Sequence, residues 1–492
     1  MRRFLHPALL VGVAAALLLP VWTVRHPPLV DYPNHLARAF ILAHPEDATL
    51  GRYYAADWSP NPYLLMDLAL VALQGVMPVE IAGRVLLSVA LLALPLCVWF
   101  FLKQVSPGHD FVALWSLLLC QNFFFLTGLV NLQLGIALCF LVLGLWLRWL
   151  ERITLGVWVL LAFLATLLYF THLMGFAVAA LIATLLTLRT RRPRFVLYTT
   201  WSLFLPGALM LIYSRAGSGG PDIVFRSLAS KPLVPLIAIE SYSQPLDYAT
   251  FAAVAVAIVA ARWRNPEFRW NPQWLEVCLL LYLLYWILPF GVSTATYVHL
   301  RLVPFYWVAG LAAARIGRRA WMLAPVALLL FAVRTADMVR NFNARQPELD
   351  SFTRSFQVTT QGARVLPLVE WKGERKQVEL HYSHFWAHGV IEKRWFTPYL
   401  FHDPGVHPLR IVHAAYAPAV REYLPTVYRQ PPDWIRIQQD YDFIWAYNVP
   451  AFRTELSRIS ALVFEEGDLR VYRVSPRSPP SAGDPLPLRG EK

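Results

Sequence analysis

The feature that most constrains this chain is a series of apolar runs that recurs from the N-terminus to about residue 337. The runs have roughly 18 to 22 residues, so each is long enough to cross the ~30 Å hydrocarbon core of a bilayer as a helix. Hydrophobic residues make up 57% of the 492 residues and charged residues only 15%. The sequence therefore predicts a polytopic α-helical membrane protein with about 11 spans, at 7–24, 81–102, 110–127, 130–148, 153–171, 173–188, 195–214, 247–262, 273–291, 303–316 and 320–337.

Basic residues gather in the short segments between these spans, where Lys and Arg typically mark the cytoplasmic side. They are Arg148, Arg152, Arg189, Arg191, Arg192, Arg194, Arg262, Arg264, Arg315, Arg318 and Arg319. The predicted spans put all of these residues, and the N-terminus, on one side. We therefore expect a bacterial inner-membrane protein with a cytoplasmic N-terminus, and with 25–80 and the C-terminal part in the periplasm. The net charge of +13 is not gathered on one soluble face, so nucleic-acid binding is not expected.

The run at 63–77 is apolar but shorter than the others. As a helix it would measure only about 22 Å, and a further span here would invert the orientation of the N-terminus or of the later basic segments. Asp67 and Gln74 are seven residues apart and therefore share one helical face. We predict a helix that lies in the membrane interface, within an outer loop at 25–80.

After about residue 338 the composition changes from continuous apolar runs to alternating polar and apolar residues. Strands are predicted at 377–382, 409–416 and 441–449, with a hairpin at 462–474 and a helical stretch near 349–369. The expected organisation is a membrane module at 1–340, a small α/β periplasmic domain at 341–475 and a Pro-rich disordered tail at 476–492.

The stretch "PPLVDYPNHLARAF" at 27–40 places Asp31, His35 and Arg38 directly after the first span. Pro33 suits the first turn of a helix that we expect to end near residue 44. Asp31 precedes this helix, and His35 and Arg38 lie on one of its faces. One interpretation is structural, with Asp31 as a helix cap and the other two solvating the interface. The alternative is a functional group at the outer membrane boundary.

A second polar group falls at the same expected level. Tyr297, His299 and Arg301 open the span at 303–316, and His172 lies in the outer turn between two spans. Arg301 either extends to the lipid headgroups or holds a phosphate, whose oxygens a guanidinium binds in a bidentate manner. His172 either satisfies its turn or supports a site, and Asn131 is expected to be structural.

In order and topology more than in identities, residues 7–340 resemble the GT-C class of membrane glycosyltransferases, which includes protein mannosyltransferases and the aminoarabinose transferase. Three stretches carry the resemblance: the acid that opens the outer loop at Asp31, the Pro-led stretch "SPNPYLLMDLALVALQGVMPVEIAGRVLLSVALLAL" (59–94), and "HLRLVPFYW" (299–307). Members of this class commonly carry a soluble domain on the outer side.

The resemblance implies an inverting transfer of a sugar from a polyprenyl-phosphate-linked donor to an envelope glycan, lipid or protein acceptor. Asp31 would be the general base. Arg301, helped by His299, would bind the donor phosphate. His35, Arg38, His172 and Tyr297 would bind substrate or support the site.

Two departures bear on metal and activity. Many GT-C enzymes have paired acids at the first site, but Tyr32 follows Asp31 here, and Asn131 offers no second carboxylate. Divalent cations prefer several carboxylate oxygens, so we expect no metal and no other cofactor. A non-catalytic relative that binds lipid-linked glycan or scaffolds envelope assembly is the alternative, and a lipid or polysaccharide transporter is a third.

The C-terminal part contains a run of histidines, of which His384 and His388 have the i, i+4 spacing of a helical zinc site. The adjacent Glu of the H-E-x-x-H motif is missing, so we do not predict a metal here. Acceptor binding is the alternative for these side chains.

Overall fold

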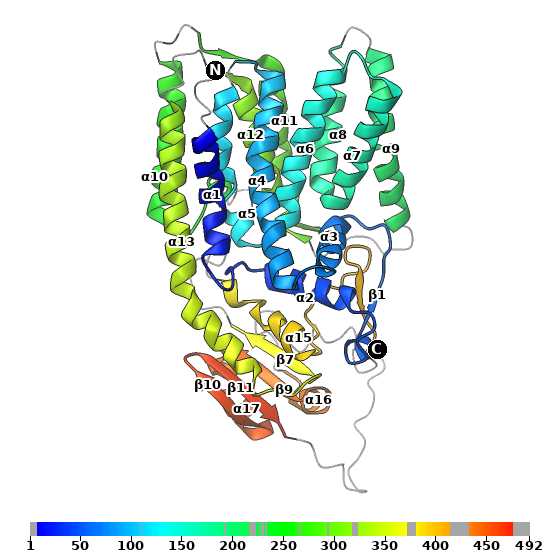
Figure 1. The fold of residues 1–492 in the computed structure, drawn as a ribbon, viewed down its shortest axis with the longest axis vertical. Coiled ribbons are helices and arrows are strands. Elements are labelled where there is room, and N and C mark those ends of the chain that lie inside the picture. Colours follow the sequence, from blue (N-terminus) through cyan, green and yellow to red (C-terminus); the bar gives the residue numbers. More distant parts are fainter. Residues whose placement is uncertain are drawn as a thin grey trace.

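A computed structural model describes residues 7–475 apart from 109, 191–192, 216–222, 226, 228–230, 232–233, 264, 266, 293–294, 317–322, 371–379 and 414–431. A bundle of long helices forms one part of the molecule, and a smaller domain built around a sheet lies at one end of it (Figure 1). This arrangement confirms the predicted class, a polytopic helical membrane protein with a small C-terminal α/β domain.

Each predicted span corresponds to a helical element of the bundle. Four helices are long and apolar enough to cross a membrane by length and composition alone: α4 (Val79–Val105), α6 (Val130–Trp149), α9 (Pro193–Arg215) and α10 (Gln244–Arg262). Beside them lie shorter apolar helices (Figure 1): α1 (Pro7–Trp22), α7 (Leu155–Thr171), α8 (Leu173–Thr187), α11 (Pro272–Ile287) and α12 (Val303–Ala313). The last element, α13 (Leu323–Phe356), runs from the bundle into the C-terminal domain and crosses residue 341, the predicted boundary.

The span predicted at 110–127 is not one α-helix. It consists of the 3-10 helix η2 (Asp110–Leu119) and the single turn α5 (Phe123–Leu126). The break falls at Asn122, whose side chain accepts hydrogen bonds from the backbone N–H groups of Phe124 and Phe125. A side chain in this capping position marks the start of a new helix, so two helical segments take the place of the predicted span.

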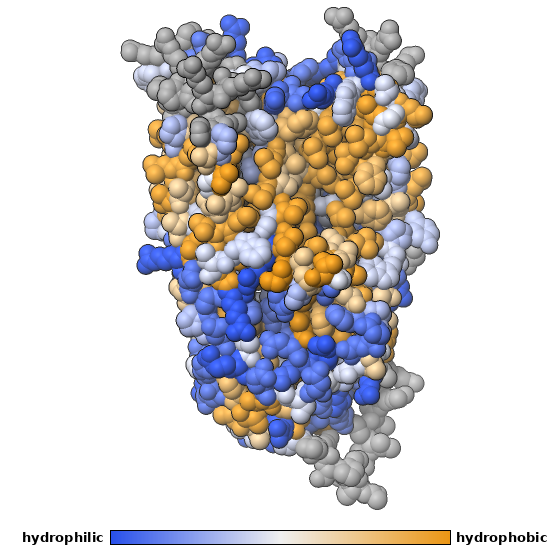
Figure 2. Space-filling model, viewed as in Figure 1, coloured by the Kyte–Doolittle hydropathy of each residue, from blue (hydrophilic) through white to orange (hydrophobic). Residues whose placement is uncertain are grey.

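On the face shown in Figure 2, a belt of apolar side chains covers the bundle, and hydrophilic residues lie above and below it. Large apolar residues are strongly exposed here, among them Ile212 at 68%, Val256 at 66% and Leu329 at 65%. So much exposed apolar surface suits a hydrocarbon environment and would be unstable in water.

The basic segments meet at the end of the bundle that lies away from the C-terminal domain. The strands β3 (Arg269–Trp270) and β6 (Ala314–Arg315) pair there. Arg189 at the end of α8 forms an ion pair with Glu276 at the start of α11. The chain therefore carries its described basic loops on one face, as the charge pattern predicts.

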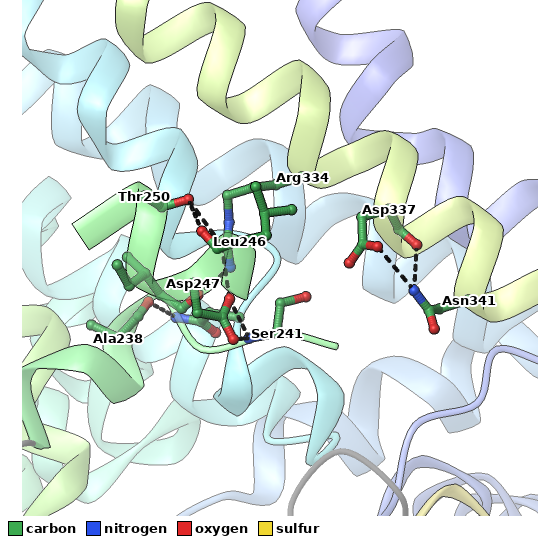
Figure 3. Close-up of polar contacts among 10 residues, drawn as sticks. Ala238, Ser241, Leu246, Asp247, Thr250, Arg334, Asp337 and Asn341 are labelled. Atoms are coloured by element: carbon green, nitrogen blue, oxygen red, sulfur yellow. Dashed lines mark hydrogen bonds and ion pairs between the residues drawn. The ribbon is translucent and has the colours of Figure 1, made fainter. Parts of the chain in front are cut away.

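A buried ion pair joins α10 to α13 close to their contact (Figure 3). Arg334 Nη1 lies 2.9 Å from Asp247 Oδ1, and both side chains are at most 5% exposed. Asp247 also accepts two hydrogen bonds of 3.0 Å from the backbone N–H of Ser241, and Arg334 donates to Thr250 Oγ1. Both charged groups therefore find their ion-pair and hydrogen-bond partners inside the protein.

The loop at 25–80 contains the two predicted short helices, α2 (Tyr32–Ala43) and α3 (Leu64–Gln74), and the strand β1 (Tyr54–Ala56). The polar face of α3 packs against α2 and does not face water. Asp67 is 1% exposed, and Gln74 donates to the carbonyl oxygen of Ala39. The face that Asp67 and Gln74 share is therefore covered by α2, and the position of α3 in the membrane interface stays a prediction.

The C-terminal domain has a sheet of order β10-β11-β9-β7. The predicted hairpin forms β10 (Ser460–Glu466) and β11 (Leu469–Val474), turning at Gly467 with φ of 60°. The strand β9 (Phe443–Tyr447) also agrees with the prediction, and it pairs in parallel with β7 (Val365–Val369). The helix predicted near 349–369 is therefore wrong at its end, where the fully apolar VLPLV becomes a buried strand.

Two other predicted strands differ from the structure in their described residues. Leu380–Tyr382 is a 3-10 helix, and the rest of 377–382 lies outside the described residues, as does the tail at 476–492. The stretch predicted at 409–416 is described as far as residue 413, and within it β8 (Leu409–Ile411) pairs with β1. This pairing fixes the C-terminal domain to the loop at 25–80.

Candidate active site

A cavity of about 390 Å³ lies where the start of α2, the turns of the bundle and the C-terminal domain meet. Asp31 and Arg301 both line it, although 270 positions of sequence separate them. His35, His172 and Tyr297 line it as well. Of the predicted site residues, Arg38 and His299 are the two that do not reach the cavity.

The backbone of Asp31 is held by the turn that follows α5. Val30 N–H donates to the carbonyl oxygen of Leu126 at 3.0 Å, and Asp31 N–H donates to that of Thr127 at 2.9 Å. The next residue, Gly128, has φ of 83°, and a Cβ there would lie 2.8 Å from the nitrogen of Tyr32. Only glycine satisfies both the left-handed conformation and the close approach.

The carboxylate of Asp31 occupies the N-cap position of α2 but makes no capping hydrogen bond. It is 19% exposed and faces the cavity. Burial raises the pKa of Asp31 from 3.8 to about 7, and the opposing positive charge of Arg301 limits the increase. A carboxyl group with a pKa near neutrality is suited to accept a proton from a substrate.

Arg301 lies in the short 3-10 helix η5 (Leu300–Leu302) ahead of α12. Its Nη2 donates to the carbonyl oxygen of Thr296 at 3.0 Å, while its buried Nε has no hydrogen-bond partner in the described part of the chain. No carboxylate pairs with it among the described residues. The positive charge of the guanidinium and its remaining N–H groups are therefore available to bind an anion in the cavity.

Two tyrosines that line the cavity have left-handed backbones, Tyr63 with φ of 73° and Tyr297 with φ of 60°. A bulky residue in this region is strained by about 1–3 kcal/mol, and such residues cluster at functional sites. Tyr297 packs edge-on against Phe123 and Phe290. Its strained turn sets the position of Thr296, the residue that holds Arg301.

The side chain of His299 is buried. Its Nδ1 lies 3.3 Å from the carbonyl oxygen of Pro289, and its ring packs against Tyr285 and Phe290. It supports the segment that carries Arg301 and does not itself line the cavity.

Arg38 forms a closed pair with Asp67 beneath the cavity. Its Nε and Nη2 lie 2.9 and 3.0 Å from the two carboxylate oxygens, and both side chains are 1% exposed. Arg38 Nη2 also lies 3.0 Å from His35 Nδ1. Because a guanidinium can only donate, His35 accepts at Nδ1 and carries its proton on Nε2.

His35 is therefore a neutral hydrogen-bond donor. Burial, and after it the charge of Arg38, hold the pKa of His35 well below its ordinary value. In His172, too, Nδ1 is an acceptor, because it accepts a hydrogen bond from the backbone N–H of Met174 at the start of α8. The neutral form of each ring has its remaining proton on Nε2, a donor suited to phosphate or sugar oxygens.

The C-terminal domain supplies one wall of the cavity through His384, Phe401, Asp403 and His407. His384 Nε2 lies 3.5 Å from Asp31 Oδ1. The histidine-rich stretch stands out in the sequence, but nothing in its spacing shows that it meets Asp31. Asn131 lines the cavity too, and its buried Oδ1 has no partner among the described residues.

The similarity of this chain to known proteins is seen in its structure and not in its sequence. No family model and no curated protein matches the chain. The apo crystal structure of ArnT from Cupriavidus metallidurans, a GT-C aminoarabinose transferase, is 13% identical, with a TM-score of 0.56 over 94% of this chain and 97% of that one. The chain has a GT-C-like fold.

A second structure of ArnT, bound to undecaprenyl phosphate, covers the same shares of both chains with 12% identity and a TM-score of 0.52. At this level of sequence identity the similarity shows the fold alone, and the chemistry of the site has to be inferred from its residues. The GT-C-like fold includes the C-terminal domain, because the alignment extends over nearly the whole of both chains.

Proposed function

We propose that this protein is an inverting glycosyltransferase that moves a sugar from a polyprenyl-phosphate donor to an envelope acceptor. The observation that carries the proposal is that a carboxyl group with a raised pKa lines one cavity together with a guanidinium that has no ion-pair partner among the described residues. The GT-C-like fold and the undecaprenyl phosphate bound by ArnT support the class of donor.

The reaction would proceed in a single displacement. Asp31 takes the proton from an acceptor hydroxyl or amine as that atom bonds to the anomeric carbon. The bond between this carbon and the phosphate oxygen breaks, and its electron pair stays on the phosphate. Arg301 stabilises the charge that develops there. General base catalysis of this kind typically contributes about 10²–10⁴-fold.

The cavity would open on the periplasmic side of the bacterial inner membrane. The described basic loops lie at the end of the bundle opposite the C-terminal domain, and Lys and Arg in short loops mark the cytoplasm. The N-terminus would then be cytoplasmic. An acceptor from the envelope would reach the cavity between the membrane surface and the C-terminal domain.

The test uses Asp31→Asn in membranes of cells that lack the wild-type protein. Lipid and glycan profiles by mass spectrometry should show one sugar modification that appears with the wild-type protein and is lost with the variant. Arg354→Gln is a matched control, because Arg354 pairs with Glu466 on the surface of the C-terminal domain, away from the cavity. An unchanged profile with Asp31→Asn excludes the base role.

The same variant separates loss of chemistry from loss of fold. Since burial disfavours the ionised form of Asp31, an amide of the same shape removes a cost that grows as the pH rises from about 4 to about 7 and stays constant above that. Asp31→Asn should therefore unfold at the same or a higher temperature than the wild-type protein at pH 8. A large decrease would instead identify a structural residue.

A further inference from the structure

We propose that the C-terminal domain completes the site by supplying His384 as the positioning residue of Asp31, through a hydrogen bond from Nε2–H to the carboxylate. This inference builds on the proposed function, because it names the residue that orients its base. The separation of 3.5 Å between His384 Nε2 and Asp31 Oδ1 is long for a hydrogen bond. Contacts of this kind commonly tighten when substrate binds.

The hydrogen bonds of Asn34 determine which nitrogen of His384 carries the proton. Asn34 Oδ1 accepts from the backbone N–H of Phe401 at 2.8 Å, and Asn34 Nδ2 donates to the carbonyl oxygen of Tyr399 at 3.0 Å. The orientation of the amide is therefore set from both ends. Its Nδ2 also lies 3.4 Å from His384 Nδ1.

A donor facing Nδ1 makes that nitrogen an acceptor, so the proton of neutral His384 resides on Nε2 and points toward Asp31. Burial lowers the pKa of His384 to about 4, so the ring stays neutral at physiological pH. Edge-on contacts with Trp386 and Phe401 hold its plane. A fixed, neutral donor stabilises the carboxylate without the charge that would suppress its basicity.

The other groups that face Asp31 do not replace this contact. Arg301 acts on it through charge across the cavity. His35 is held by Arg38, His172 caps α8, and His407 lies against Asp403 in the wall that the C-terminal domain supplies. The phenols of Tyr63 and Tyr297 complete the titratable groups lining the cavity among the described residues.

The consequence is that docking of the C-terminal domain and competence of the base are linked. Asn34 belongs to α2 and His384 to the C-terminal domain, so the contact forms only when the two parts are packed together. The pairing of β1 with β8 and the bonds from Asn34 to the segment at 399–401 maintain that packing.

The experiment measures the protonation of Asp31 by infrared difference spectroscopy of the full chain in detergent, without substrate. The Asp31 band is assigned by its loss in Asp31→Asn. In His384→Leu its titration should move upward by about one pH unit, since hydrogen bonds to charged groups are worth roughly that much. In His384→Gln, whose amide also donates, most of the shift should be absent.

His413→Leu is the matched control, because His413 is another partly buried imidazole of the C-terminal domain and packs on Tyr53, away from Asp31. It should leave the band unchanged. An unchanged titration in His384→Leu overturns the proposal, as does an equal shift in His384→Gln. Since no transfer is assayed, failure here and failure of the proposed function give different results. Where His384→Leu fails to fold, the titration in His384→Gln decides, because a shift there contradicts the proposal.

Discussion

Two kinds of acid–base neighbours occur within this protein, and they differ in how their charges are used. Arg38–Asp67 and Arg334–Asp247 are buried ion pairs. We call them closed pairs because all described contacts of the two carboxylates are with other groups of the protein. Asp31 and Arg301 are close in space but share a cavity and form no ion pair. The closed pairs hold helices together, whereas the open neighbours retain charge that a substrate can meet.

The difference shows that burial alone does not identify a functional charge. Arg38 and Asp31 come from one short stretch of sequence, yet α3 covers the first and the cavity exposes the second. What separates them is the presence of a geometrically matched partner. Breaking a closed pair should therefore cost stability, and altering an open neighbour should cost binding or rate.

The largest expected effect is on the closed pair below the cavity. Arg38→Leu leaves the Asp67 carboxylate buried without its partner, which typically costs about 3–5 kcal/mol. We expect a large decrease in the unfolding temperature in detergent and poor recovery of folded protein. The double variant Arg38→Leu/Asp67→Leu should regain most of the loss, since two apolar side chains remove the unpaired charge. A neutral effect of the single variant contradicts the comparison.

Arg301→Gln should show the opposite behaviour. Among the described residues, the side chain of Arg301 makes one hydrogen bond and no ion pair, so the unfolding temperature should change little. Its loss should weaken binding of undecaprenyl phosphate by roughly 10- to 100-fold, because hydrogen bonds between charged groups contribute about 1.5–3 kcal/mol. Titration of the purified full chain with that lipid in mixed micelles measures the effect. Binding of unchanged strength would place the anion elsewhere.

Gly128→Ala tests how accurately the open carboxylate must be placed. The new Cβ would lie 2.8 Å from the backbone nitrogen of Tyr32, and φ of 83° is strained for alanine. We expect a loss of about 1–3 kcal/mol in stability and a decrease in kcat beyond what lower protein recovery explains. Gly51→Ala, where a Cβ meets nothing within 4 Å, is the control. Equal behaviour of the two variants would show that the turn does not position Asp31.

The pH dependence of transfer follows from the raised pKa of Asp31. Because the base must be ionised, kcat/KM should rise with pH and reach half of its plateau near pH 7. Below that value the rate should fall about tenfold per pH unit. Removing the positive charge in Arg301→Gln should move this limb to higher pH. A limb near pH 4, the ordinary value for an aspartate, would mean that Asp31 is better solvated in the working enzyme.

The sequence allowed the helical class, the gathering of the basic loops at one end of the bundle and the placement of Asp31 and Arg301 at one level to be predicted. All three depend on local hydrophobicity and on counting spans, which are properties of the sequence itself. The contact between α2 and α3 was not predicted, although a carboxylate within the apolar run at 63–77 signalled that Asp67 needs a partner.

The role of the C-terminal domain was beyond such reasoning. His384 approaches Asp31 only because the pairing of β1 with β8 docks the domain on the outer loop. Nothing local distinguishes His384 from His388, whose ring packs against Phe385 and His26 instead. Tertiary docking assigns the two histidines different tasks.

The smallest expected effect concerns an exposed pair at the same docking surface. Arg410 on β8 pairs with Asp57 beside β1, and the arginine side chain is 60% exposed. Solvent and salt screen such a pair, so Arg410→Ala should cost less than about 1 kcal/mol and the difference should vanish at high ionic strength. Unfolding temperatures of the variant and the wild-type protein at low and high salt measure it. A loss as large as that of Arg38→Leu would show that partner geometry is less important than position at the docking surface.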